Sequence, residues 1–305
     1  MSLRKMLYAD LALLGVTAIW GATFVTMKNL LTSTPPLTIL FWRFLVAFGV
    51  LVSQFRPRCF RTVKAGVLLG GALFGGYVFQ TLGLLYVPPA RSAFVTGFCT
   101  VVVPFFAFFI LRTKPEKTLP GSVALALLGL FLLTSGNGKD SSLLFGDILT
   151  LLGATAYALQ IVLVERFAKG NDAFALATVE MGTVAVLSFL LTLFFFKQKM
   201  LPQDWAAWGS ILFLGVAATG FAFTVQKVAQ RYTSATHAGI IFISEPVFAA
   251  IFSFFLWGER LTTRGLFGCL FISLGILTTQ LRLSPNAPPL QPSIQTQDPQ
   301  GREGR

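Results

Sequence analysis

The chain has 305 residues, of which 54% are hydrophobic and 12% charged, and its mean hydropathy is +0.73. Since soluble proteins carry charge at about a quarter of their positions, this composition excludes an ordinary soluble protein and indicates a membrane protein. A net charge of +12 would suggest nucleic-acid binding in a soluble chain, but here the basic residues gather between hydrophobic stretches, where they set membrane topology. We therefore expect no nucleic-acid partner.

Ten apolar stretches reach, or come close to, the roughly 20 residues that a helix needs to cross a bilayer. Their continuous apolar character excludes an outer-membrane barrel, whose strands alternate apolar and polar residues. The connectors are short and rich in Pro, Gly and Asn. The sequence thus predicts an all-α membrane protein with ten transmembrane helices, at residues 9–31, 37–55, 65–86, 91–111, 120–136, 147–167, 173–196, 207–230, 236–257 and 265–281.

The basic residues predict the orientation of these helices. With the amino terminus inside, the cytoplasmic connectors hold twice as many Lys and Arg residues as the opposite ones, so both termini are expected in the cytoplasm. Lys28, Arg91 and Lys227 lie close to span ends and are interpreted as side chains that reach the membrane surface. Residues 284–305 are rich in Pro, Gln and Ser and are expected to form a disordered tail.

The chain contains an internal repeat. Residues 13–18 and 151–156 share a Leu-Leu-Gly-x-Thr-Ala pattern, and residues 80–86 correspond to 226–232. The predicted halves are residues 1–136 and 145–283, each with five helices. Because five is odd, the second half enters the membrane from the opposite side, which gives inverted repeats. The alternative is that such short matches arise by chance in a hydrophobic chain.

Three groups of segments resemble the EamA-domain family of the drug/metabolite transporter superfamily. They are Trp-Gly-Ala-Thr-Phe at 20–24; Gln-Thr-Leu-Gly-Leu-Leu-Tyr at 80–86, followed by 93–97 and Pro104; and Ser-Glu-Pro-Val-Phe at 244–248, followed by Leu-Trp-Gly-Glu-Arg-Leu-Thr at 256–262. The resemblance covers about residues 8–281 and implies a carrier of small organic solutes, often an exporter of amino acids, other metabolites or toxic compounds. The first half has Leu-Arg-Thr-Lys-Pro at 111–115, where a Gly-Glu pair is common in the second half of such proteins, and this departure weakens any mechanistic use of Glu259.

Ionisable residues inside a bilayer cost several kcal/mol, about 3 on insertion scales, so each needs a partner, a watery cavity or a function. Arg43 and Glu180 occupy corresponding places in the two halves. They could form an ion pair across a central cavity that substrate breaks. The alternative is that each pairs with polar backbone near a membrane surface.

Glu245 precedes Pro246 within an apolar span, where proline leaves a carbonyl one turn back without its helical donor. Such a break is tolerated where the backbone lines a cavity. Glu245 is therefore a candidate for proton titration or for binding a substrate amine, and the alternative is a carboxylate that caps a broken helix. Pro104 and Pro246 are candidate hinges.

Aromatic and amide side chains at mid-depth are the remaining candidates for substrate binding, because their polar atoms need partners away from water. They are Trp20, Phe24, Tyr77, Gln80 and Tyr157. A glycine series at 66, 70, 71, 75 and 76 is interpreted as a packing surface. Since the cysteines number three and are scattered, and the chain has one histidine, we expect no disulfide framework, metal site, cofactor or catalytic residue.

The sequence as a whole favours a secondary transporter of the cell membrane that moves a small organic metabolite by alternating access, with the lipid bilayer as its surroundings. The sequence contains no phosphate-binding GxxxxGK[ST] segment, so nothing in it indicates that the protein uses ATP. Proton coupling and simple facilitated diffusion both stay open, as do a monomer and a homodimer. The other functional classes considered are an integral-membrane enzyme that modifies lipids and a scaffold that transports nothing; of these, an enzyme is not expected, since clustered Asp or His residues are missing.

Overall fold

The computed structural model describes residues 3–54, 59–113, 119–134, 141–196, 200–202, 204–233, 235–242 and 244–280, which form helices joined by short turns, with no strand among them. The first part of the chain forms α1 (Leu3–Leu30), α2 (Pro36–Gln54), α3 (Phe60–Tyr86), α4 (Pro89–Gly97), α5 (Cys99–Leu111) and α6 (Leu119–Thr134). The rest forms α7 (Ser141–Ala168), α8 (Ala173–Leu191), the π-helix η1 (Thr192–Phe196), α9 (Trp205–Gly215), the π-helix η2 (Val216–Phe221), α10 (Ala222–Ala229), α11 (Ala235–Phe242), α12 (Ser244–Trp257) and α13 (Thr263–Gln280).

Each of the ten predicted spans coincides with one or more of these helices. Seven helical stretches are long and apolar enough to cross a membrane: Leu7–Leu30, Pro36–Ser53, Phe60–Leu84, Pro89–Leu111, Ser142–Ala168, Ala173–Phe194 and Trp205–Ala229. Two shorter apolar helices cover Ser244–Trp257 and Thr263–Gly275. The chain is therefore a multi-pass helical membrane protein, and the total of ten crossings stays a prediction. The predicted tail lies outside the described residues.

The outer surface of the bundle is apolar, as a lipid-facing surface must be. Large side chains such as Phe109, Phe131 and Phe255 are more than 60% exposed. The buried charged side chains instead point toward the interior of the bundle. This distribution is the reverse of that in a soluble protein and agrees with the hydropathy of the chain.

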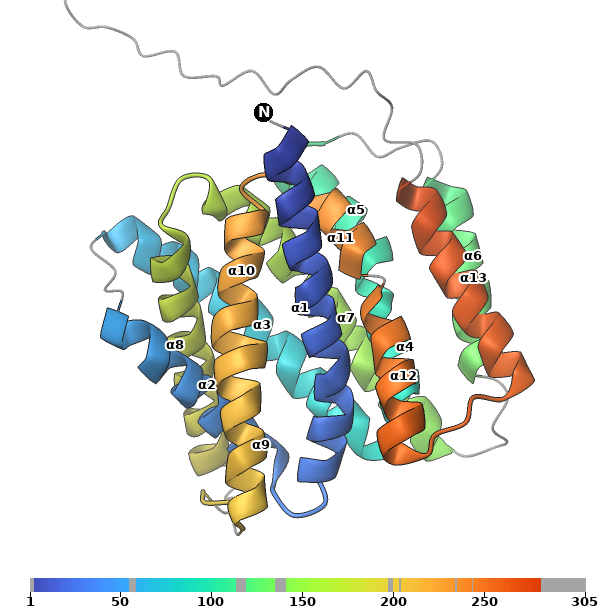
Figure 1. Cartoon of the computed structure of the whole chain (residues 1–305), viewed down its shortest axis with the longest axis horizontal. Coiled ribbons are helices and arrows are strands. Elements are labelled where there is room, and N and C mark those ends of the chain that lie inside the picture. Colours follow the sequence, from blue (N-terminus) through green and yellow to red (C-terminus); the bar gives the residue numbers. More distant parts are fainter. Residues whose placement is uncertain are drawn as a thin grey trace, which may run out of the picture.

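Close helix packing organises the interior. Figure 1 shows α6 and α13 side by side at one edge of the bundle, and α3 packs along both α7 and α8. Glycines allow that approach, because a Cβ atom added at Gly66 or Gly70 would lie 2.5 Å from the Cβ of Val179 or Thr183 on α8. The predicted packing role is confirmed for these two glycines, whereas Gly71 has open space beside it.

A second close approach joins α1 to α12 and supports a prediction. A Cβ atom at Gly21 would lie 2.6 Å from the Cβ of Phe248 and 2.8 Å from the backbone nitrogen of Ala249, so the helices must separate to admit it. We expect Gly21→Ala to destabilise the protein by about 1–3 kcal/mol. Gly15, on the same helix, has nothing within 4 Å, so Gly15→Ala is the matched control. Thermal unfolding in detergent measures both, and equal unfolding temperatures would contradict the expected contact.

Candidate functional site

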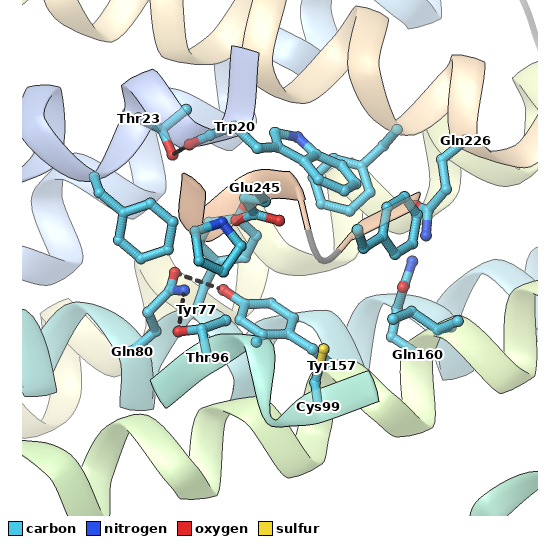
Figure 2. A pocket seen from close by; sticks show the side chains of 16 residues that line it. Trp20, Thr23, Tyr77, Gln80, Thr96, Cys99, Tyr157, Gln160, Gln226 and Glu245 are labelled. Carbon is cyan, nitrogen blue, oxygen red and sulfur yellow. Dashed lines mark hydrogen bonds between the residues drawn. The ribbon is translucent and has the colours of Figure 1, made fainter. Parts of the chain in front are cut away.

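A small cavity lies at the centre of the bundle, between helices from both parts of the chain (Figure 2). Its volume is about 60 Å³, room for a few water molecules but not for a metabolite. Six aromatic side chains line it: Trp20, Phe24, Tyr77, Tyr157, Phe223 and Phe242. Six polar side chains also line it: Thr23, Gln80, Thr96, Gln160, Gln226 and Glu245. The described residues thus surround a small polar and aromatic site at the centre of the bundle.

Six of the eight predicted binding residues line this cavity, namely Trp20, Phe24, Tyr77, Gln80, Tyr157 and Glu245. Pro246 lines it as well. Arg43 and Glu180 are buried behind the lining, and Pro104 lies inside α5 outside the lining. The geometry thus brings most of the candidates together, and their contact with substrate stays a prediction. The sequence analysis missed Gln160 and Gln226, although both amides stand in apolar spans as Gln80 does.

An interrupted helix and the start of α12 meet at the cavity. The span that begins at Pro89 is broken at Phe98, between α4 and α5, whereas Pro104 lies inside α5 and its role as a hinge stays a prediction. The freed carbonyl of Gly97 accepts a hydrogen bond from Thr100 Oγ1 at 2.9 Å, which lets the turn exist in an apolar setting. A Cβ atom at Gly97 would lie 3.1 Å from Cγ of Pro246, so the break faces the start of α12.

α12 begins at Ser244, directly before Glu245 and Pro246. The Ser244 hydroxyl donates to the carbonyl of Ile241 at 2.7 Å and lies 2.7 Å from the hydroxyl of Thr17 on α1. These contacts join the start of α12 to α11 and to α1. Pro246 is in the first turn of α12, where a missing amide proton costs little. The start of α12 therefore presents the Glu245 side chain to the cavity.

A hydrogen-bond chain fixes one wall of the cavity. The Tyr157 hydroxyl donates to Oε1 of Gln80 at 2.9 Å, and Nε2 of Gln80 donates to Oγ1 of Thr96 at 3.0 Å (Figure 2). The rings of Tyr77 and Tyr157 meet edge to face, with centroids 5.4 Å apart. The two rings and the Gln80 amide thus have defined orientations, contributed by α3, α4 and α7.

Arg43 binds that wall on the side away from the cavity. It is 1% exposed, donates from Nε to Thr219 Oγ1 at 2.6 Å and from Nη2 to the Tyr77 hydroxyl at 2.8 Å. The hydroxyl of Thr219, a residue of the π-helical turn η2, donates in turn to the carbonyl of Leu214 at the end of α9 at 2.7 Å. Arg43 therefore binds polar groups of α3 and η2, and not Glu180 as one hypothesis had it.

Glu180 forms a different ion pair, with Lys227 of α10. Both side chains are fully buried, and Nε2 of Gln160, a residue of the cavity lining, donates to Glu180 Oε1 at 2.9 Å. The interpretation of Lys227 as a side chain that reaches the membrane surface is wrong, because its ammonium also donates to the carbonyl of Phe223 at 3.2 Å inside the protein. The pair joins α8 to α10, and so lies behind the cavity rather than across it.

The π-helical turn η2 also binds α1. Trp20 Nε1 donates to the carbonyl of Ala218 at 2.9 Å, and the Trp20 ring packs on Phe223 and Phe242 with centroid distances of 5.0 and 5.4 Å. A π-turn exposes carbonyl groups that an α-helix would use internally, and such turns recur at functional sites. No local sequence signal predicted η2.

A second buried ion pair lies at the start of α4. Arg91 and Asp147 are 4% and 2% exposed, and two parallel hydrogen bonds of 3.0 and 2.5 Å join them. Arg91 therefore does not reach the membrane surface as expected, but fastens α4 to α7. Lys28 does lie near a span end, where its ammonium donates to the carbonyls of Leu84 at 2.6 Å and Val87 at 3.0 Å and so caps the end of α3.

Two carboxylates bind the starts of α4 and α11. Glu259 Oε2 accepts from the backbone amide of Ala90 at 2.9 Å and from the Ser253 hydroxyl, and Glu165 Oε2 accepts from the amide of Ala235 at 2.8 Å. A negative charge at a helix amino terminus is favourable. The starts of α4 and α11 are thus anchored in the same manner.

The fold and the site define a multi-pass helical membrane protein with a polar and aromatic cavity at its centre. The sequence profile of the EamA-like transporter family matches it twice, at residues 7–135 and 144–280. The chain belongs to the EamA-like transporter family.

Known relatives agree with this membership. The chain is 30% identical over 279 residues to an uncharacterized transporter of Archaeoglobus fulgidus, with 92% of this chain and 88% of the relative covered. It is 26% identical to the uncharacterized transporter YyaM of Bacillus subtilis, with 90% and 94% covered, and 25% identical to the uncharacterized inner membrane transporter YedA of Escherichia coli, with 97% and 98% covered. A solved crystal structure shares the fold at 20% identity, with a TM-score of 0.68, 90% of this chain and 98% of that chain covered.

Proposed function

We propose that the protein is a secondary transporter of the cell membrane that exports a small organic metabolite by alternating access, without ATP. The observation that carries this proposal is the central cavity, which is lined by polar and aromatic groups from both parts of the chain. A site between the two halves that is too small for a metabolite in one conformation suits a carrier whose site opens to each side of the membrane in turn.

Helix pairing supports two inverted five-helix repeats, residues 1–136 and 145–283. α1 packs against α10 and α12 of the second half, and α7 packs against α3, α4 and α5 of the first. α2 packs against α8 and α6 against α13, so corresponding helices also meet each other. The double family match has nearly the same bounds as the proposed halves. Two such halves could exchange conformations about the cavity between them.

The basic residues still support cytoplasmic termini. The burial of Lys227 and Arg91 removes one residue from each side of the membrane in the count of basic connector residues. The excess on the cytoplasmic side therefore stays about twofold. Arg91 and Asp147 would then lie toward the outer surface, and Glu165 and Ala235 toward the cytoplasm.

A transport measurement tests the function. Purified full-length protein is reconstituted into vesicles, a mixture of labelled amino acids, amines and organic acids is added at two pH values, and uptake is compared with protein-free vesicles. We expect at least one solute to accumulate or exchange in a protein-dependent way, with a pH difference if protons are coupled. Protein that keeps its helical content in the vesicles yet transports no member of such a mixture would argue against a metabolite carrier.

A further inference from the structure

Glu245 differs from the other buried charged groups at the centre of the protein. Glu180 is paired with Lys227, and Arg43 with Thr219 and Tyr77. Among the described residues, Glu245 is the one charged side chain that lines the cavity, and it has no hydrogen bond or ion pair there. Figure 2 shows its carboxylate directed into the space between the rings of the lining.

No group of the cavity lining supplies a counter-charge to this carboxylate. Arg43 interacts with Glu245 electrostatically, but its guanidinium is held by two hydrogen bonds of 2.6 and 2.8 Å and is screened from the cavity by Tyr77, whose ring lies 4.5 Å from Cζ of Arg43. A carboxylate out of water needs a cation or a proton close to it. A cation that enters the cavity would meet that need directly.

The rest of the lining also favours a positive ligand. Six aromatic rings surround the space, and the face of an aromatic ring attracts a cation. Gln226 is 1% exposed, and its Oε1 atom accepts no hydrogen bond from the described residues. It lies opposite Gln160 at one end of the cavity in Figure 2. A ligand with N–H donors and an apolar body would use both the unpaired acceptors and the rings.

We propose that the central cavity binds a small organic ammonium ion with an aromatic or apolar body, with Glu245 as its counter-ion. Binding of the ion does not depend on the proposed carrier function. Only the statement that the bound ion is also the transported solute rests on that proposed function. Because the described cavity is too small for such an ion, the site binds it in a more open state and closes around it. An organic anion would lack a free cationic partner in the lining, and a zwitterion would need Arg43 to leave Thr219 and Tyr77.

Binding to the full-length protein in lipid nanodiscs tests the proposal, with Trp fluorescence and calorimetry as readouts. The probes are 2-phenylethylamine, the uncharged 2-phenylethanol, the anion 3-phenylpropionate and the zwitterion phenylalanine, which share a phenyl ring. We expect the amine to bind about tenfold or more tightly than the other three. Equal binding of the alcohol, or preferred binding of the anion or the zwitterion, would overturn the assignment without any variant being needed.

Glu245→Gln keeps the shape of the side chain and removes its charge. We expect it to weaken amine binding by about 30-fold or more, since the loss of one partner of a buried charge pair is costly. Asp172→Asn is the matched control, because Asp172 is exposed, caps α8 through bonds to the amides of Phe174 and Ala175, and can be replaced by Asn as a cap. Unchanged affinity in folded Glu245→Gln would overturn the proposal.

The two proposals fail in different ways. Amine binding that depends on Glu245, without uptake of any solute by vesicles, would contradict the carrier and leave the ammonium site intact. Protein-dependent uptake of organic acids, with no amine binding, would support the carrier and overturn the ammonium site.

Discussion

Lys227→Met should destabilise the protein by about 3–5 kcal/mol, because it leaves the carboxylate of Glu180 buried without its cation. Met has nearly the volume of Lys, so the effect measures the charge and not a cavity. Lys169→Met, at an exposed position, is the matched control and should leave stability nearly unchanged. The thermal unfolding midpoint, followed by circular dichroism in one detergent for all variants, provides the measurement.

The double variant Glu180→Leu with Lys227→Met separates the effect of the ion pair on stability from the effect of each side chain alone. Removing both charges also removes the desolvation cost, so the double variant should recover most of the lost stability. An additive loss in the double variant would mean that each side chain contributes through its own packing. A Lys227→Met variant as stable as Lys169→Met would show that the ion pair does not hold α8 to α10.

The positions of the helices could be predicted from the sequence because hydropathy is an average over about 20 residues. The break at Phe98 and the π-turn η2 could not be predicted in the same way. The break at Phe98 occurs in an apolar run and depends on Thr100, whose hydroxyl replaces a helical donor for Gly97. The π-turn η2 depends on Trp20 and Arg43, which belong to other helices and bind its polar groups.

The candidate site, like the helices, could be predicted from the sequence only in part. Aromatic and amide residues at mid-depth were expected near a cavity because lipid offers their polar atoms no partners, and Tyr77, Gln80 and Tyr157 do line it. The residues that Glu180 and Arg43 bind could not be predicted from the sequence. Glu180 and Arg43 occupy corresponding positions, but Lys227 corresponds to Thr81 under the alignment of residues 80–86 with 226–232. The second half therefore contains a cation that has no counterpart in the first, and Glu180 pairs within its own half.

Gly76→Ala should reduce transport and cavity binding about tenfold or more, because the added methyl group takes the place of the Tyr157 ring. A Cβ atom at Gly76 would lie 2.5 Å from both Cδ1 and Cε1 of that ring. Tyr157 can avoid this overlap only by moving, and such overpacking costs about 1–3 kcal/mol. Since its hydroxyl donates to Gln80 at 2.9 Å, the displaced ring would also disturb the Gln80–Thr96 bond.

The neighbouring Gly75 supplies the control. A Cβ atom at Gly75 would lie 3.6 Å from the Cβ of Ala156, an ordinary van der Waals contact, and both substitutions alter the helix propensity of α3 equally. Gly75→Ala should therefore keep transport near the wild-type rate in vesicles, while Gly76→Ala should lose it with its helical content intact. Equal transport by the two variants would mean that the orientation of Tyr157 does not matter for the site, and would remove the Tyr157–Gln80–Thr96 wall from the mechanism.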